Sequence, residues 1–290
     1  MRQPVFRFAP SPNGLLHLGH ALSALDGYQK ATRAGGRFLV RIEDIDQARC
    51  REDYVAAIFE DLEWLGLKWE TPVLRQSLHF SRYRAAAQAL LDLGLLYRCF
   101  ATRSDIASAA AASPAGFDPD GAPLYPGLHK GLAQSEIDRR LARDEPFALR
   151  IDMEKAMRMA AQKCEPSPLT FTEAADDGSE RAIPARPETW GDAVIVRKDT
   201  PASYHLSVVA DDAAQGVTHV TRGQDLYAAT GLHRLLQVLL DLPEPVYAHH
   251  RLLLAEDGRK LAKSAGDSSL RELRARGVTA DAVREMLQLK

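Results

Sequence analysis

Two histidines near the start of the chain have a type and a spacing that suit phosphate chemistry. His17 and His20 flank Gly19 and lie three residues apart, so a helix would place both imidazoles on one face. The free N–H groups and the dipole of a helix N-terminus favour anions, and the imidazoles add donors there. Gly19 allows a bulky nucleotide to approach the backbone closely. The pattern predicts a triphosphate site, although two histidines that only line or cap a helix start would look the same.

Two lysines far along the chain could supply fixed positive charge. Lys260 and Lys263, followed by Ser264, lie in a segment bordered by Gly258 and Gly266. A lysine in such a place can neutralise the charge that builds on phosphate groups during attack at an α-phosphorus. The alternative interpretation is an ordinary solvated turn, which this composition also produces.

The segment around the two histidines has the pattern of a parallel α/β sheet. A β-prone run at Val5–Phe8 enters a turn-rich stretch, and helical apolar spacing over Leu15–Ala34 ends at Gly35. A second strand is expected at Arg37–Ile42. This order is typical of a Rossmann-like nucleotide-binding core, in which ligands lie at the carboxyl ends of the strands. The loop before the helix is therefore the expected edge of an active site.

The rest of the chain suggests a core that is interrupted by an insertion. Residues 51–67 and 80–96 have the patterning of amphipathic helices that cover a sheet, and strands are expected at Ala193–Arg197 and Ser207–Ala210. A further helix is expected at Leu232–Leu240. The expected parts are the first half of the α/β core at 1–98, an inserted α+β module at 99–190, the second half of the core at 191–242, and the lysine segment with short C-terminal helices at 243–290.

The composition is that of an ordinary globular protein and excludes several classes. Of 290 residues, 46% are hydrophobic and 26% are charged, and the net charge of -2 excludes a globally basic nucleic-acid binder while leaving room for a local RNA patch. The N-terminus has no apolar signal region and no apolar run is long enough to span a bilayer, so a cytoplasmic location is expected. Cys50, Cys99 and Cys164 are odd in number and widely spaced, and are expected to be unpaired thiols.

The two motifs, taken together and in this order, resemble the signatures of class I aminoacyl-tRNA synthetases. The segment with His17 and His20 is similar to the family's H-x-G-H signature, and Lys260–Ser264 is similar to its lysine loop. Three further segments narrow the resemblance to the glutamate branch: Arg7–Gly14, Arg41–Asp46 and Val217–Leu226. The likeness covers residues 5–46 and about 192–264 and is looser in the insertion. It implies an enzyme that activates glutamate with ATP.

The pocket that this resemblance implies has to match the charges of glutamate. Glutamate presents two carboxylates and one ammonium, so its pocket should offer arginines and at least one acid. The resemblance implies that Glu43 faces the ammonium and that the amino-acid pocket is formed by Arg7, Ala9, Ser11, Glu43, Tyr204 and Arg222. It implies that ATP, with Mg²⁺, contacts Pro10, His17, Gly19, His20, Lys260, Lys263 and Ser264, of which His17, His20 and Lys263 are catalytic. Which arginine holds the side-chain carboxylate stays open, and so does the alternative that residues 41–46 form a charged strand end with surface pairs.

A zinc site is common in the insertion of proteins that this chain resembles, on a C-x-C pair, a tyrosine and a further cysteine. Here Ala101 stands at the second position of the pair that begins at Cys99, and His129 follows Tyr125 in place of a cysteine. A structural zinc needs about four nitrogen or sulfur ligands. Cys99, Tyr125 and His129 therefore form an incomplete set, and magnesium with ATP is the expected cofactor.

The lysine segment is followed by a short C-terminal tail. Residues 265–290 provide enough chain for one or two short helices but not for the anticodon-reading domains of ordinary glutamyl-tRNA synthetases. This architecture is similar to that of glutamyl-queuosine tRNA(Asp) synthetases, and the resemblance implies a monomer that transfers glutamate to queuosine in the anticodon loop of tRNA(Asp). Single-stranded loops are open to protein recognition. Charge alone suggests four contacts with RNA: Arg139, Arg140, Arg143 and Arg251.

Three other functions stay open. A shortened glutamyl-tRNA synthetase would charge a tRNA acceptor end, and a non-catalytic paralogue would bind RNA only. A small-molecule nucleotidyltransferase would share the histidine motif without needing the pocket of Arg7, Glu43 and Arg222. Substitution of His17 and Lys263 separates enzyme from binding module, because activity would collapse while RNA affinity would largely survive.

Overall fold

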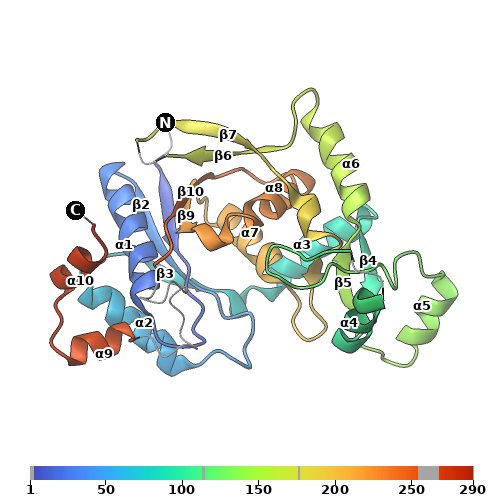
Figure 1. Ribbon diagram of the computed structural model, residues 1–290, viewed down its shortest axis with the longest axis horizontal. Helices are drawn as coiled ribbons and strands as arrows, with labels where there is room; N and C mark the ends of the chain where they lie inside the picture. The colour runs from blue at the N-terminus through green and yellow to red at the C-terminus, as the bar shows by residue number, and fades with distance from the viewer. Residues whose placement is uncertain (1–2, 113–114, 176, 254–267, 290) are drawn as a thin grey trace.

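The large sheet of the protein is a parallel α/β sheet. A computed structural model of the chain describes residues 3–112, 115–175, 177–253 and 268–289 (Figure 1). The sheet has seven strands in the order β3-β2-β1-β9-β10-β6-β7, and all neighbours are parallel except β6 and β7. The strands are β1 Val5–Phe8, β2 Arg37–Ile42, β3 Glu70–Arg75, β6 Thr170–Ala174, β7 Glu180–Pro184, β9 His219–Gly223 and β10 Val246–His250. The expected α/β class is therefore confirmed.

Helices cover this sheet and fill the connections between its strands. The long helices expected from the apolar spacing are confirmed as α1, α2, α3 and α8, each within a few residues of the expected ends. The helices are α1 Leu18–Arg33, α2 Glu52–Trp64, α3 Phe80–Asp92, α4 Arg103–Ala112, α5 Gln134–Leu141, α6 Met153–Cys164, α7 Tyr204–Ala214, α8 Ala229–Leu239, α9 Leu270–Ala275 and α10 Ala280–Met286. Three short 3-10 helices are η1 Gln76–Leu78, η2 Pro187–Trp190 and η3 Gln224–Leu226.

One expected strand is wrong. Ser207–Ala210 lies inside α7, whose side chains from Leu206 to Asp212 are all buried. A run that is buried on every side shows neither strand alternation nor a helical stripe, so its periodicity does not decide between the two structures. The helix begins where Ser203 accepts a hydrogen bond from the N–H of Leu206, an N-cap that the sequence pattern alone left unused.

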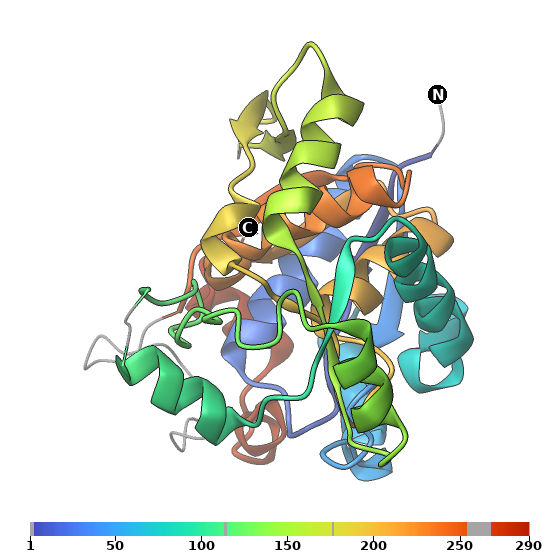
Figure 2. The same cartoon turned by 90° about the vertical axis from the view of Figure 1, so that its right-hand side faces the viewer.

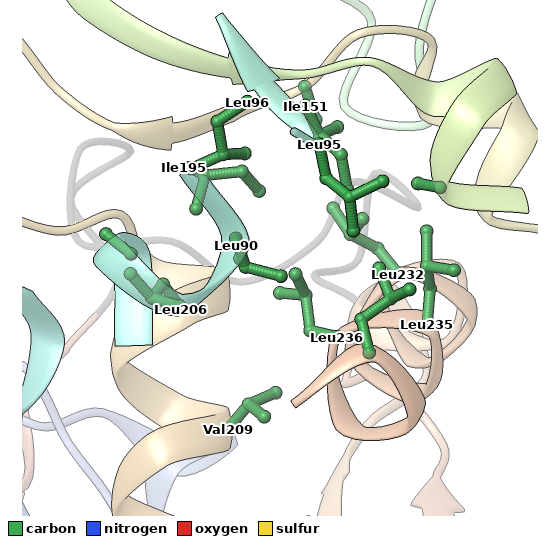
Figure 3. Packing of buried hydrophobic residues seen from close by; sticks show 14 of the residues in the cluster. Leu90, Leu95, Leu96, Ile151, Ile195, Leu206, Val209, Leu232, Leu235 and Leu236 are labelled. Atoms are coloured by element: carbon green, nitrogen blue, oxygen red, sulfur yellow. The ribbon is translucent and has the colours of Figure 1, made fainter. Parts of the chain in front are cut away.

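A second, smaller sheet is antiparallel and packs against helices. It has the order β4-β5-β8, with β4 at Leu96–Cys99, β5 at Ala148–Ile151 and β8 at Val194–Val196. Leu96 and Ile151 of this sheet pack in one apolar cluster with Leu232 and Leu236 of α8 (Figure 3). Of these strands only β5 lies wholly within residues 99–190. The strands β6 and β7 lie in the same range but extend the large sheet.

The two ends of the molecule differ in what covers them. Helices α9 and α10 lie beside α2 at one end (Figure 1), and their Leu270, Val283 and Leu287 join the core around α1 and α2. Helices α4 and α5 lie at the opposite end, which faces the viewer in Figure 2. Among the described residues, no helix is long and apolar enough to cross a membrane. The three cysteines, all within the described ranges, are free thiols as expected.

Candidate active site

A cavity of about 430 Å³ opens at the carboxyl ends of the central strands. Arg7 near the end of β1, Glu43 just after β2, Arg222 near the end of β9 and His250 at the end of β10 contribute to its walls. Because these strands are parallel neighbours, their carboxyl ends meet at one edge of the sheet. The N–H of Glu43 donates to the carbonyl of Pro10 at 3.0 Å, which ties the loop after β1 to the loop after β2. The site therefore lies at the edge that the sequence predicts.

The two histidines of the first motif organise the N-terminus of α1. His17 is the N-cap, and its Nδ1 accepts a hydrogen bond from the N–H of Gly19 at 3.1 Å. The Nδ1 of His20 accepts one from the N–H of His17 at 3.2 Å, and the ring centroids lie 3.9 Å apart. Since both Nδ1 atoms accept, the proton of each neutral ring is on Nε2. Both histidines line the cavity, so the pair that caps the helix also faces the candidate site.

Gly19 is needed for the position of His17. A Cβ atom at this glycine would lie 2.9 Å from Cε1 and 3.1 Å from Nδ1 of the His17 ring. The glycine therefore leaves room for the imidazole that caps its own helix, in addition to the room that the sequence suggests for a nucleotide.

One side of the cavity holds a buried network of paired charges. Arg7 donates to both carboxylate oxygens of Asp212, at 3.1 and 3.2 Å. Arg41 donates to Asp212 at 2.6 Å and to Glu43 at 3.1 Å. Burial raises the pKa of Glu43, and the guanidinium of Arg41 opposes this effect. The two arginines lower the pKa of Asp212 against the effect of burial, so this carboxylate stays charged.

Residues 41–46 could also have been a charged strand end that forms only surface ion pairs. That interpretation holds for part of the segment. Asp46 pairs with Arg49 at 2.9 Å and with Arg197 at 3.2 Å near the surface. Asp44, in contrast, is buried and accepts from the backbone N–H of Ser77 at 2.8 Å. Glu43 faces the cavity, so one short segment serves the surface, the fold and the site.

The other side of the cavity holds a buried arginine with neutral partners. Arg222 is 4% exposed and donates to Oγ1 of Thr230 at 2.6 Å and to Nδ1 of His233 at 3.1 Å. Its Nε donates to Nε2 of His249 at 3.4 Å, and its guanidinium lies 5.2 Å from the ring centroid of Tyr247. Among the described residues, no carboxylate forms a salt bridge with Arg222, whereas Arg7 pairs with one carboxylate and Arg41 with two.

The histidines around Arg222 are neutral, and their tautomers follow from their partners. An arginine can only donate, so Nδ1 of His233 accepts and its Nε2 carries the proton. That Nε2 lies 3.2 Å from Nδ1 of His205, which therefore accepts in turn. Burial, together with the charge of Arg222, lowers the pKa of His205 to about 4 and that of His249 to about 3. These rings are therefore uncharged, and Arg222 carries the positive charge of this group of side chains.

Tyr204 at the start of α7 also lines the cavity, and its ring centroid lies 5.6 Å from that of His233, a partner of Arg222. Burial raises the pKa of Tyr204, while the charges of Arg222 and Arg7 lower it. The charged groups described on the two sides are three arginines (7, 41 and 222) and two acids (43 and 212), which differ by one positive charge when both acids are ionised. Glutamate carries one net negative charge, so the cavity and this ligand are complementary in charge.

Most of the predicted site residues come together in this cavity. Its lining includes Arg7, Ala9, Pro10, Ser11, His17, Gly19, His20, Glu43, Tyr204 and Arg222. Lys260, Lys263 and Ser264 lie outside the described residues. The interpretation from sequence missed Asp212, Thr230, His233 and His249, which hold the arginines from helix α7, helix α8 and strand β10. The one signal for Asp212 in the sequence is that an acid follows the apolar run of α7.

The three candidate zinc ligands meet, but they bind one another and the backbone. The Sγ of Cys99 donates to the hydroxyl of Tyr125 at 3.3 Å, which also accepts from the N–H of His129 at 2.9 Å. Nδ1 of His129 accepts from the N–H groups of Phe100 and Ala101, both at 3.1 Å. In the described part of the chain, no group of three or more His, Cys, Asp or Glu side chains could hold a metal ion. The donor set does not fit a four-ligand zinc site.

The arginines suggested for RNA contact are largely engaged within the protein. Arg139 pairs with Glu136, and Arg140 pairs with Glu136 at 2.6 Å and with Glu145 at 2.9 Å. Arg251 donates to the carbonyl of Leu287 at 2.9 Å and lines the cavity. Contact of these residues with RNA stays a proposal.

Comparison with known proteins identifies the family. The family model described as tRNA synthetases class I (E and Q), catalytic domain, matches residues 4–290. A glutamyl-Q tRNA(Asp) synthetase of Rhodobacter capsulatus is 43% identical over 98% of this chain and 100% of its own length. A glutamate–tRNA ligase of Parasynechococcus marenigrum is 35% identical over 98% of this chain, which spans only 57% of that ligase. The crystal structure of the glutamate-tRNA synthetase from Elizabethkingia anophelis matches with a TM-score of 0.72 and 27% identity, over 91% of this chain and 53% of its own. The chain therefore belongs to the family of class I tRNA synthetases for glutamate and glutamine, of which it contains the catalytic domain.

Proposed function

We propose that this protein activates glutamate with ATP and transfers it to the queuosine base in the anticodon loop of tRNA(Asp). The observation that carries the first step is Arg222, a buried cation whose hydrogen-bond partners among the described residues are neutral. It lies near the end of a strand, in a cavity that His17 and His20 also line. The choice of acceptor is supported by the likeness to the Rhodobacter capsulatus enzyme, which extends over all of that protein.

Arg222 is the residue that receives the side-chain carboxylate of glutamate in this proposal. Arg7 already gives two donors to Asp212, so it has fewer left for a ligand. Among the described residues Arg222 has no directly paired carboxylate, since Glu173 reaches it only through His249, and a buried charge is costly until it is paired. Glu43 receives the ammonium group, which would also restore the charged state that burial opposes. Tyr204, Ala9 and Ser11 line the pocket.

The first step joins glutamate to AMP. An oxygen of the α-carboxylate attacks the α-phosphorus of ATP, which is bound with Mg²⁺, and the bond from this phosphorus to pyrophosphate breaks. The Nε2–H groups of His17 and His20 donate to the phosphates at the N-terminus of α1, where the helix dipole also favours negative charge. Lys263, with Lys260 and Ser264, is proposed from the sequence motif to stabilise the leaving pyrophosphate.

The decisive experiment measures glutamate-dependent exchange of pyrophosphate into ATP without any tRNA, and then transfer of labelled glutamate to RNA. We expect exchange with glutamate but not with glutamine or aspartate, because neither places a second carboxylate on Arg222 in the same position. We expect transfer to tRNA(Asp) that contains queuosine and none to the same RNA without this base. Transfer to the acceptor end of unmodified tRNA(Glu) would instead identify a shortened tRNA-charging enzyme. Absence of both reactions would exclude catalysis.

A further inference from the structure

Three side chains form a row across the large sheet, from the glutamate cavity to strand β6. Arg222 lies on β9, His249 on β10 and Glu173 on β6, which are neighbouring parallel strands (Figure 1). His249 is the register partner of Arg222, and Glu173 is the partner of Tyr247, two residues before His249. Register partners, and residues two apart on one strand, point to the same face of a sheet. The three side chains therefore meet on one face, and of the three only Arg222 belongs to the lining of the cavity.

The tautomer of His249 follows from its two neighbours in this row. Nε of Arg222 can only donate, so Nε2 of His249, which lies 3.4 Å away, accepts. Burial and the charge of Arg222 lower the pKa of His249 to about 3, so the ring is neutral and has one N–H group. That proton is therefore on Nδ1, which donates to Oε1 of Glu173 at 2.8 Å. His249 has its proton on the opposite nitrogen from His233.

The ring of His249 is packed on both sides, so its proton and not its position is what a partner can change. Tyr227 meets the ring edge to face at 4.9 Å, and Tyr247 lies parallel to it at 6.3 Å. The side chain of His249 is 0% exposed and that of Glu173 is 18% exposed. An apolar residue in place of Glu173 would leave the buried Nδ1–H without this acceptor, which is costly. A move of the proton to Nε2 would then set two donors, His249 and Arg222, against each other.

The bonds that hold Arg222 use one N–H group from each of its three nitrogens. Nε donates to His249, Nη1 to His233 and Nη2 to Thr230. A guanidinium has five N–H groups, so these three bonds leave two, one on each terminal nitrogen. Two such groups match the two oxygens of a carboxylate. A carboxamide offers one acceptor and one donor, so glutamine would set its NH₂ group against one of them.

We infer that Glu173 is a positioning residue for glutamate: through the tautomer of His249 it fixes the guanidinium of Arg222, whose two remaining N–H groups face the side-chain carboxylate of the substrate. This inference rests on the proposed function, because it concerns the arginine that the proposed function assigns to glutamate. Glu173 and His249 do not touch the substrate, and no bond is made or broken at either of them. Strand β6, which lies within residues 99–190, thereby contributes to the choice of amino acid.

The first measurement identifies the tautomer directly. In protein labelled with ¹⁵N at histidine, a long-range ¹H–¹⁵N spectrum distinguishes a protonated ring nitrogen from an unprotonated one. The signals of His249 are those that are missing in His249→Gln. We expect a protonated Nδ1 and an unprotonated Nε2 in the wild type, and protonation at Nε2 to appear in Glu173→Leu. Protonation at Nε2 in the wild type would overturn the inference before any activity is measured.

The second measurement is the KM for glutamate in pyrophosphate exchange. Glu173→Leu should raise this KM about tenfold, because a buried donor loses its acceptor. Its kcat should change by less than about threefold, since Arg222 holds a part of the substrate away from the reacting carboxylate. Glu173→Gln keeps a carbonyl oxygen for Nδ1 of His249, and its KM should stay within about threefold of the wild type. Glu244→Leu is the matched control, because it removes the carboxylate that accepts from the N–H of Thr172 on the same strand; its KM should equal that of the wild type.

Each other outcome counts against one of the two claims. A KM of Glu173→Leu equal to that of the wild type would overturn the inference and leave the proposed function intact. The same rise in Glu244→Leu would also overturn it, because the integrity of β6 and not the carboxylate of Glu173 would then matter. A Glu173→Gln protein as defective as Glu173→Leu would show that the charge of this residue, and not the tautomer of His249, is needed. A wild-type protein without glutamate-dependent exchange would overturn the proposed function, and the inference with it.

Discussion

The arginines on the two sides of the glutamate cavity are buried to a similar degree but are compensated differently. Arg7 and Arg222 are 6% and 4% exposed. Arg7 shares Asp212 with Arg41, so its charge is balanced inside the protein. Arg222 is held by a hydroxyl, two imidazoles and an aromatic ring, none of which carries a negative charge.

This difference separates a structural charge from one that is available to a ligand. A buried ion pair is strongly destabilising when one partner is removed, because the other partner is then left unpaired. A buried arginine with neutral partners is already in that condition, and a carboxylate ligand removes it. The two sides of the cavity should therefore respond differently to substitution, one mainly in stability and the other mainly in activity.

The largest expected effect is on stability, at Asp212. Asp212→Asn removes the carboxylate that Arg7 and Arg41 share, and we expect the free energy of unfolding to fall by about 3–5 kcal/mol. Urea unfolding followed by circular dichroism measures this change. Arg222→Met is the comparison, because it removes a buried charge that has no acidic partner within the described chain; its stability should be equal to that of the wild type or higher. A loss as large as that of Asp212→Asn would show that the two sides are not different.

The next effect is on glutamate activation, at Arg222. Arg222→Gln should lower kcat/KM for glutamate in pyrophosphate exchange by roughly 30- to 5,000-fold, which corresponds to about 2–5 kcal/mol for a buried charged hydrogen bond. Arg234→Gln is the matched control on α8, since Arg234 pairs with Glu244 outside the cavity lining and should leave exchange nearly unchanged. If Arg7→Gln lost activity while Arg222→Gln kept it, Arg7 and not Arg222 would hold the side-chain carboxylate.

The motifs on strand ends could be predicted from sequence because local patterns carry them. The turn-rich loop after β1 and the histidines at the start of α1 come within a few residues of each other in sequence, so their meeting needs only one βαβ unit. Arg222 lies on β9, more than two hundred residues away from Arg7, and the resemblance to a family rather than periodicity joined the two.

The residues that hold those motifs were not predictable in the same way. Thr230 and His233 lie on the buried face of α8, where helical spacing predicts core packing and not a hydrogen bond to Arg222. Ser207–Ala210 failed as a strand because a fully buried helix has no polar face to reveal its period. Polar partners from distant elements become visible only when the tertiary fold brings them together.

A smaller effect is expected when one neutral partner of Arg222 is removed. Thr230→Val keeps the shape of the side chain and removes the hydroxyl that accepts from Nη2 of Arg222 at 2.6 Å. Hydrogen bonds to charged groups contribute about 1.5–3 kcal/mol, so we expect KM for glutamate to rise about tenfold or more, with a smaller change in kcat. Thr230→Ser restores the hydroxyl and should recover most of the affinity. Equal KM values in all three proteins would mean that Thr230 does not position Arg222.

The smallest effect is in the pH dependence of stability, and it tests whether the rings beside Arg222 are neutral. Burial lowers the pKa of His205 to about 4 from the ordinary value of 6.5, so the unfolded chain binds more protons than the folded protein between these values. Its contribution to stability is fully present above about pH 6.5 and is lost as the pH falls toward 4. His205→Asn should therefore make the unfolding free energy fall less steeply over this window, as measured by urea unfolding at a series of pH values. Asp61→Asn is the opposite control, because burial raises the pKa of Asp61 to about 6 and this acid stabilises the folded protein as the pH falls; removing it should make the decline steeper. A His205→Asn protein with an unchanged slope would mean that folding does not lower the pKa of His205, and the neutral environment inferred around His233 and Arg222 would then lose this support.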